Sequence, residues 1–390
     1  MIGTSVRAGI LTLVVLVLAA PLGAQSTGAF VTRLGVDTLA VERFTRSASR
    51  MEGDVLLFVP QVRVIRYQVD FAPDGAVRTF GFEQRAPNDT LPPAIVRIAF
   101  DADSIRTTVT RGAQVTNRAG PGQPDARPHG VYFWALYELE TESFARAPAD
   151  SVTFWMVPTG GGPAVATVFR RRAPDTLSTT WFQPEYHLDY AFDRGGRLMG
   201  LNGLNTTIKM LVERLASVPF DDLVARATER ERASGPRGAA STRDSTTTTV
   251  GGTAVTLVYS RPLKRGRTIW GGVVPFDQVW RTGANAATRF SVSAPVRLGE
   301  IDVPAGDYTL YSLPTATGAQ LIVNRQFGQW GTEYHAEQDL ARIPVRVERL
   351  ATLVEQFTFL VREAAGGAEL VLEWDQVRWV IPMRTGQGGH

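Results

Sequence analysis

The segment from Trp280 to Asn285 combines side chains that suit ligand binding. Arg281 carries a planar guanidinium with several donors, and the amide of Asn285 both donates and accepts hydrogen bonds. Trp280 adds a flat apolar face, and Gly283 permits a positive φ or a close approach of another backbone. Together these residues suit a polyol, a carboxylate or a peptide. The alternative is that Arg281 pairs with a carboxylate and fixes the loop, while Trp280 lies in the core.

Two further tryptophans and a short polar segment could extend such a site. Trp270 and Trp330 stand beside glycines in expected loops, where an exposed indole could stack on a sugar. Each could equally belong to the core. Tyr334, His335 and Asp339 follow closely, and a histidine near an acid can act as a general base or a metal ligand. The alternative is an isolated surface histidine, because His335 and Asp339 would align only on a helix.

The composition excludes several kinds of site. The chain has 390 residues and no Cys, which excludes disulfide frameworks, thiolate metal sites and cysteine nucleophiles. With four His and no zinc-protease, phosphate-loop or dinucleotide motif, we expect no metal and no cofactor, and no catalytic residue can be assigned. Basic and acidic residues number 41 and 38 and alternate along the chain, so nucleic-acid binding is not expected.

The chain begins with the pattern of an export signal. Arg7 precedes an apolar run from about Ile10 to Ala20, and small residues at 23 and 24 provide a cleavage site. That run is too short to span a bilayer comfortably, and no later segment is long enough. We therefore expect an exported protein, periplasmic or extracellular, with no transmembrane segment in the mature chain. An uncleaved N-terminal anchor is the alternative.

The rest of the chain divides into two parts. Residues 233–253 are small and polar, which predicts a flexible linker. This linker follows the signal peptide (1–24) and an N-terminal part (28–232), and it precedes a C-terminal part (254–384). Both parts contain short runs with strand periodicity, which predicts a mainly β protein of two domains.

The N-terminal part is expected to be an antiparallel sheet with one or two helices. Residues 63–71 alternate in polarity, and Asp74-Gly75 is a hairpin signal before a return strand. Helices are predicted over 131–144 and 220–232. The order of elements resembles the half-barrel of lipoprotein carriers, which implies a concave apolar face that could hold an acyl chain. The alternative is a closed core. Further strands are expected over 95–100, 105–110, 152–157, 165–169, 177–181 and 208–215.

The C-terminal part is expected to be a β-sandwich, because six short runs rich in β-branched and aromatic residues are separated by turn signals. It also contains an ordered set of motifs: Ser260-Arg261-Pro262, Gly266-Arg267, Trp270-Gly271, Val274-Pro275, the segment 279–285, Thr288, the segment 304–308, Pro314, Asn324, Trp330-Gly331, Asp339, Arg342 and Trp374.

In these motifs the C-terminal part resembles the secreted bacterial family called domain of unknown function 2911, over about residues 257–383. The resemblance implies an exported, β-rich domain with no established activity. The family usually has Glu where this chain has Ala286. A carboxylate that served acid–base chemistry in the family would therefore be absent here.

Three functions fit these features. A non-catalytic binding protein for a glycan, peptide or lipid of the cell envelope is favoured by the export signal and the missing catalytic motifs. A structural or assembly protein of the envelope would have a large exposed apolar patch. A hydrolase of unfamiliar type would use Arg281 and Asn285 to stabilise negative charge, with Asp339 or His335 moving a proton.

Overall fold

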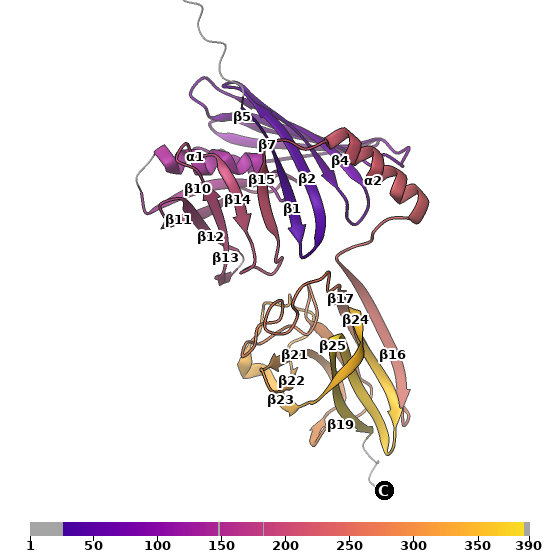
Figure 1. The fold of residues 1–390 in the computed structure, drawn as a ribbon. Helices are drawn as coiled ribbons and strands as arrows, with labels where there is room; N and C mark the ends of the chain where they lie inside the picture. The colour runs from indigo at the N-terminus through magenta and orange to yellow at the C-terminus, as the bar shows by residue number, and fades with distance from the viewer. Residues whose placement is uncertain (1–25, 147–148, 182, 386–390) are drawn as a thin grey trace, which may run out of the picture.

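The computed structural model describes residues 26–146, 149–181 and 183–385. The expected signal peptide, residues 1–24, lies outside these ranges. The structure is mainly β and consists of an N-terminal sheet domain and a C-terminal sandwich, as Figure 1 shows. This confirms the predicted fold class. Within the described ranges, no helix is both long enough and apolar enough to cross a bilayer.

Fifteen strands form one curled sheet in the N-terminal domain. Strands that follow one another in the sequence pair with one another, except β8 and β9, which stand at opposite edges of the sheet. The two halves of the sheet join where β1 pairs with β15. The pairs are antiparallel apart from β9, which runs parallel to β10. The strands are β1 (Ser26–Leu34), β2 (Asp37–Arg46), β3 (Arg50–Leu57), β4 (Arg63–Phe71), β5 (Val77–Arg85), β6 (Ala94–Phe100), β7 (Ser104–Arg111), β8 (Gln114–Pro121), β9 (Arg127–His129), β10 (Ser151–Pro158), β11 (Val165–Ala173), β12 (Thr176–Trp181), β13 (Gln183–Phe192), β14 (Leu198–Asn202) and β15 (Leu211–Leu215).

One face of this sheet packs around a short helical segment. The 3-10 helix η1 (Trp134–Tyr137) leads directly into α1 (Glu138–Arg146). All four residues of η1 are buried, in the same core as strand residues such as Phe30 and Tyr67. The expected helix is thus present, although it begins after Tyr132, whose φ of 76° is not helical. Along η1 and α1 the face that could have held an acyl chain is closed core.

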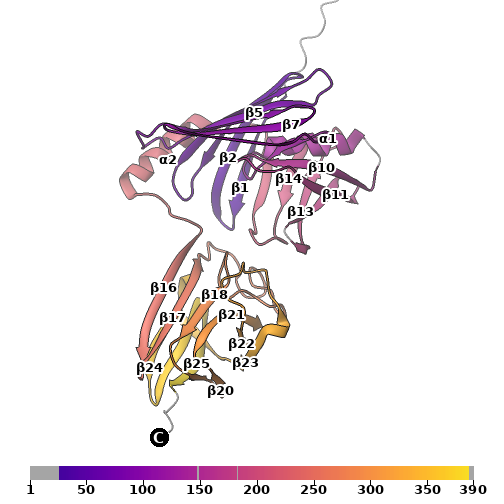
Figure 2. The same ribbon diagram turned by 180° about the vertical axis from the view of Figure 1, so that it is seen from behind.

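Helix α2 (Phe220–Ser234) lies on the opposite face of the sheet, as Figures 1 and 2 show. Its residues Phe220 and Ala227 pack on Val31, Val41 and Leu56 of the first strands. Asp221 and Asp222 in its first turn and Arg232 in its last turn suit the helix dipole. The helix predicted over 220–232 is confirmed.

Residues 241–250, expected within the linker 233–253, form strand β16 (Ser241–Val250) instead. This strand pairs with β17 (Thr253–Pro262) over its whole length. The run has few apolar side chains, but threonine is β-branched, and an edge strand needs little burial because its ladder hydrogen bonds fix it. The expectation of a flexible linker is therefore wrong for this segment, and residues 235–240 alone connect α2 to β16.

Two sheets pack face to face in the C-terminal domain, which confirms the expected sandwich. One has the order β16-β17-β18-β21-β22-β23 and the other β20-β19-β25-β24. Their shared core contains Phe290 and Leu310 from the first sheet and Phe359 and Leu372 from the second. The remaining elements are β18 (Thr288–Val292), β19 (Val296–Leu298), β20 (Ile301–Val303), β21 (Gly306–Pro314), β22 (Ala319–Asn324), η2 (Ala336–Gln338), β23 (Asp339–Pro344), β24 (Arg346–Ala364) and β25 (Gly367–Thr385).

The two domains meet at the turn between β1 and β2. The N–H of Val36 donates to the carbonyl of Arg265 over 3.2 Å, and the guanidinium of Arg265 pairs with Asp37. Gly266 has a φ of 69°, and a Cβ there would press against Val36. This close approach requires glycine, so the contact is specific to these two turns.

Candidate functional site

Two loops, residues 280–287 and 329–335, meet over β21 and β22; we call them the loop pair. The N–H of Gly331 donates to the carbonyl of Asn285 over 3.0 Å, and the N–H of Ala287 donates to that of Gln329 over 3.3 Å. Ala287 packs with Tyr311 and Ile322 in a small cluster separate from the sandwich core. The loop pair therefore covers the outer face of the six-stranded sheet.

The loop pair presents an exposed indole beside an exposed amide. Trp330 is 47% exposed in the intact two-domain chain, which is high for tryptophan. Ala286 pairs with Trp330 in an isolated bridge, so Asn285 and Trp330 lie on neighbouring backbone segments. Asn285 is exposed and adopts a φ of 60°, a conformation that asparagine tolerates better than most residues. Two of the predicted binding residues are thus exposed on neighbouring backbone segments.

Arg281 lies against the second loop through its aliphatic stem. A Cβ on Gly331 would clash with Cδ of Arg281 and with the carbonyl of Asn285. Position 331 therefore requires glycine for packing, although its φ is not positive. The contact joins the half-buried Arg281 to the second loop at the residue after Trp330.

Trp280 and Trp270 lie elsewhere, in the aromatic core of the sandwich. Trp280 stacks on Trp374 with ring centroids 6.0 Å apart and an interplanar angle of 16°. Trp270 lies 4.8 Å from Trp379, which is itself almost fully buried. Both side chains are half-buried and pack against the main core. This is the core alternative considered for each of them, so neither indole forms part of the exposed surface.

Thr282 fixes the first loop in a strained conformation. It is fully buried and has a φ of 49°, which is rare for a β-branched residue. Its hydroxyl bonds to the hydroxyl of Ser312 over 3.0 Å, and its carbonyl accepts from the hydroxyl of Thr288 over 2.7 Å. These bonds hold the sharp turn that directs Trp280 inward and Asn285 outward.

Buried polar side chains support the second loop from beneath. The hydroxyl of Tyr311 donates to the carbonyl of Glu333 over 3.0 Å and accepts from the amide of Gln329 over 2.9 Å. Asn324, fully buried, donates to the carbonyl of His335 over 2.9 Å. Trp330 therefore stands on a loop held at both ends.

Asp339 is the centre of a compact polar cluster. Its Oδ2 accepts from the hydroxyl of Tyr334 over 2.6 Å and from Arg342, and its Oδ1 accepts from Asn324 over 2.9 Å. Burial, followed by the hydrogen bond to Asp339, raises the pKa of Tyr334 to about 12. The carboxylate is already engaged by three side chains, an arrangement that anchors the loop to β23.

His335 lies at the surface. Its ring is 59% exposed and its Nδ1 lies 3.2 Å from a carboxylate oxygen of Glu337. Within the described ranges, no hydrogen bond or ion pair joins the imidazole to Asp339, because the residues between them form η2 and not a full α-helical turn. Their link is indirect, through Asn324 and the backbone of His335.

A second polar cluster, which sequence reasoning missed, surrounds η1 and α1 inside the N-terminal sheet. Glu42 of β2 is 1% exposed and accepts from the N–H groups of Trp134 and Ala135 over 2.7 and 3.2 Å. The hydroxyl of Tyr67 donates to it over 2.6 Å. Burial raises the pKa of Glu42 to about 8, although these three donors lower it. Glu42 satisfies the otherwise unpaired start of η1.

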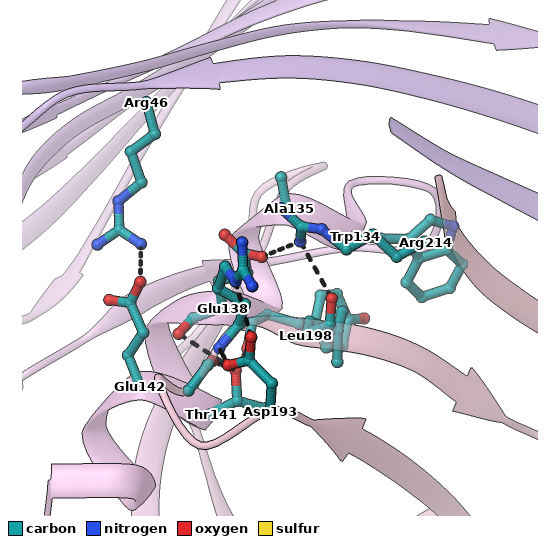
Figure 3. Close-up of polar contacts among 12 residues, drawn as sticks. Arg46, Trp134, Ala135, Glu138, Thr141, Glu142, Asp193, Leu198 and Arg214 are labelled. Carbon is teal, nitrogen blue, oxygen red and sulfur yellow. Dashed lines mark hydrogen bonds and ion pairs between the residues drawn. The ribbon is translucent and has the colours of Figure 1, made fainter. Parts of the chain in front are cut away.

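Ion pairs then fix α1 along its length, as Figure 3 shows. Glu138 pairs with Arg214 of β15, and their side chains are only 2% and 9% exposed. Arg214 also donates to the carbonyl of Leu198 over 3.0 Å. Glu142 pairs with Arg46 over 2.6 Å at the other end of the segment. These contacts make the cluster a structural clamp.

Burial shifts the pKa of two further groups of this cluster in favour of the neutral form. Burial raises the pKa of Glu140 to about 7 and lowers that of His129 to about 4. The sequence contained a signal for this cluster, since Glu140 falls on the same predicted helix face as Phe133, Leu136 and Tyr137. An acid on a face that must be buried requires a partner.

Comparison with known proteins bears on the C-terminal domain. The family described as "Protein of unknown function (DUF2911)" matches residues 241–383. This confirms the resemblance stated for the C-terminal part, and the matched range begins at the first residue of β16. The loop pair lies entirely inside it. The comparison with curated proteins finds no match.

Two solved structures are similar at a low level. A DUF1089 family protein from Pseudomonas aeruginosa has 9% identity and a TM-score of 0.31, over 43% of this chain and 90% of its own. A β-barrel-like protein of the domain of unknown function DUF1849 from Brucella abortus has 12% identity and a TM-score of 0.34, over 50% of this chain and 97% of its own. Similarities this weak support no conclusion about function.

Proposed function

We propose that the chain is an exported, non-catalytic binding protein, and that the loop pair binds a glycan of the cell envelope. The observation that carries this proposal is the exposed indole of Trp330 beside the exposed amide of Asn285. A flat apolar face suits the apolar face of a sugar ring, and an amide can donate to one hydroxyl and accept from another.

The supporting contacts favour a surface that is rigid before the ligand arrives. Buried bonds of Thr282, Tyr311 and Asn324 hold both loops in place. A preformed site loses little conformational entropy on binding, so even a small stacking surface gives measurable affinity. This rigidity distinguishes Trp330 from an apolar side chain exposed by chance.

The two other functions receive less support. For a hydrolase, Asp339 would need a free carboxylate oxygen, whereas both of its oxygens accept hydrogen bonds from neighbouring side chains. For an assembly protein we expect a contiguous apolar patch. Within the described ranges, the exposed large apolar side chains are spread over both domains, and Phe327 and Trp330 are the pair nearest in sequence.

The glycan proposal can be tested with the full mature chain. A glycan array would identify the preferred oligosaccharide, and isothermal titration calorimetry would measure its affinity. We expect Trp330→Ala to lower the affinity at least about tenfold, equivalent to about 1.4 kcal/mol. Trp330→Phe should retain most of it. Leu353→Ala removes another exposed apolar side chain of the same domain and should change nothing.

Two outcomes would count against the proposal. If the array shows no binding, a glycan ligand is ruled out. If Trp330→Ala leaves the affinity unchanged, the loop pair is ruled out as the binding site. Export is tested separately, by fractionating cells that express the full chain and sequencing the N-terminus of the exported protein. We expect it to begin at Gln25.

A further inference from the structure

The N-terminal domain has a large groove on the face of its sheet that carries α2. The groove encloses about 1380 Å³ and crosses strands β2 to β8, with residues 216–218 before α2 forming one wall. The groove lies on the side of the sheet opposite η1 and α1. Figure 2 shows α1 below β5 and β7. The volume exceeds the roughly 300–1,000 Å³ of small-molecule sites, so it suits a segment of a polymer.

Strand register aligns the lining residues in rows across the sheet. Gln68 of β4 lies opposite Gly81 of β5, which lies opposite Arg97 of β6, which in turn lies opposite Thr108 of β7. Gly81 has no side chain, and a Cβ there would meet only ordinary contacts, at 3.4 Å from the carbonyl of Val96 and 3.7 Å from Cγ of Arg97. The missing side chain therefore opens a hollow in the middle of a polar row.

The acidic side chains along the groove are already paired with neighbours. Asp54 accepts from Arg43 and Arg66, each over 3.0 Å. Asp70 accepts from Arg50 over 3.0 Å and from the hydroxyl of Thr79 over 2.7 Å. These contacts leave both carboxylates part-buried on the floor of the groove.

Arg97 differs from these residues because it is exposed and, among the residues that the structure describes, forms no ion pair with an acidic side chain. Its stem lies beside the hollow at Gly81, so its guanidinium is available to a ligand in the groove. A guanidinium of this kind recognises a carboxylate through two parallel hydrogen bonds. The centre of the groove is therefore suited to an acidic group.

We propose that this groove binds an extended segment of a polypeptide, with an acidic side chain of that segment on Arg97. The groove contains charges of both signs together with amides and hydroxyls, which matches a peptide with its alternating donors and acceptors. A polymer with one sign of charge on every unit, such as a polyanionic glycan, fits less well, because charges of both signs alternate along the groove. The proposal is independent of the glycan site, which lies in the other domain.

The test uses the mature full-length chain and three fluorescein-labelled 12-residue peptides. They share a Gly/Ser/Thr frame and carry Glu, Gln or Lys at one central position, and fluorescence polarisation measures binding. We expect the Glu peptide to bind at least about tenfold more tightly than the other two, with affinity falling as salt is raised. Gly81→Leu fills the hollow and should abolish binding.

Charge reversal at one position distinguishes a specific ion pair at Arg97 from non-specific electrostatic attraction between peptide and protein. Arg97→Glu should lower affinity for the Glu peptide at least tenfold and raise it for the Lys peptide. Arg170→Glu makes the same charge change on β11, outside the groove, and should leave both affinities unchanged. Circular dichroism and thermal unfolding of each variant confirm that the sheet is intact.

Three results would overturn the proposal. The first is equal affinity for all three peptides, or none. The second is the same loss in Arg170→Glu as in Arg97→Glu. The third is displacement of the Glu peptide by polygalacturonate at lower concentration than by unlabelled peptide, which would assign the groove to an anionic glycan instead.

Discussion

Each domain contains a polar cluster built around a short irregular segment, and the two clusters differ in burial. Around η1 and α1, Glu42, Glu138 and Arg214 are buried inside the curled sheet. Around the loop pair, Asn324 is buried but Trp330 and Asn285 remain exposed. Both clusters form hydrogen bonds with backbone groups that no helix or strand pairs. Only the second leaves side chains that a ligand can reach.

The comparison shows that perturbed titration alone is a poor guide to function in this protein. The most strongly shifted carboxyl groups, Glu42 and Glu140, lie where the sheet and helical segment enclose them. Their pKa values rise because burial disfavours the charged form. A better criterion is whether a cluster contains an exposed side chain that buried neighbours hold rigidly. Only the cluster around the loop pair meets this criterion.

The largest expected effect contrasts two tryptophans of the C-terminal domain. Trp374 is fully buried among Trp280, Trp270 and Phe357, so Trp374→Ala should cost about 3–5 kcal/mol of unfolding free energy. Trp330→Ala should lower the free energy of unfolding by less than about 1 kcal/mol, because the indole is about half exposed. Urea denaturation followed by circular dichroism measures both. Equal losses would remove the distinction between core and surface indoles.

Arginine offers the matching contrast in the N-terminal domain. Arg214→Ala leaves Glu138 buried without its partner and should destabilise the domain by about 3 kcal/mol. Arg232 pairs with Glu229 on the surface of α2, with both side chains more than 60% exposed. Arg232→Ala should cost less than about 0.5 kcal/mol. If the two variants unfold at the same urea concentration, the clamp is not a source of stability.

The pH dependence of stability should come from the buried cluster. The folded pKa of Glu42, about 8, lies above its ordinary value, so the folded state holds a proton that the unfolded state has released. Stability should therefore fall as pH rises from 6.5 to 8, by about 1.4 kcal/mol per pH unit for each such proton. His129 has its pKa lowered from 6.5 to about 4, so its contribution rises with pH and opposes that of Glu42 near pH 6.5, where the unfolded imidazole is still partly protonated.

The check for this dependence is urea denaturation at several pH values, with Glu42→Gln as the comparison. The amide cannot titrate, so the slope in Glu42→Gln should be shallower than in the original chain. An identical slope would assign the titration to another group, with Glu140 the next to replace by Gln.

The smallest effect sharpens the geometry of the loop pair. Gly331→Ala places a Cβ against Arg281 and the carbonyl of Asn285, so the two loops must separate slightly. We expect a loss of about 1 kcal/mol in stability and a larger proportional loss of glycan affinity. Gly318→Ala, where a Cβ would meet only one distant atom, is the control. A neutral Gly331→Ala would mean that the loops are not tightly packed.

Much of the fold follows from local pattern. Alternation over 63–71 and the Asp74-Gly75 turn predict β4 and β5, and acidic residues in its first turn predict α2. One of the six apolar runs that predict the C-terminal sandwich covers residues 288–292 and coincides with β18. Strand β16 was expected as linker, because a polar edge strand owes its order to ladder hydrogen bonds with distant residues. The first three strands, which lie inside the large sheet, were also not predicted.

The candidate site was predicted only in part. Arg281, Asn285 and Trp330 were identified from residue type, and tertiary contacts join their two loops. The placement of Trp280 and Trp270 in the core, with Trp330 outside, could not be decided from neighbouring glycines. The roles of Asp339 and His335 likewise depended on η2 being too short to align them.

The sequence by itself determined that this is a cysteine-free, two-domain β protein with a C-terminal part similar to a family of unknown function. Tertiary structure decided which polar groups are enclosed and which reach solvent, and it formed the groove on the α2 face from residues on successive strands. The physical reason is that composition and periodicity act over a few residues. Exposure is set by pairings between residues that are far apart along the chain.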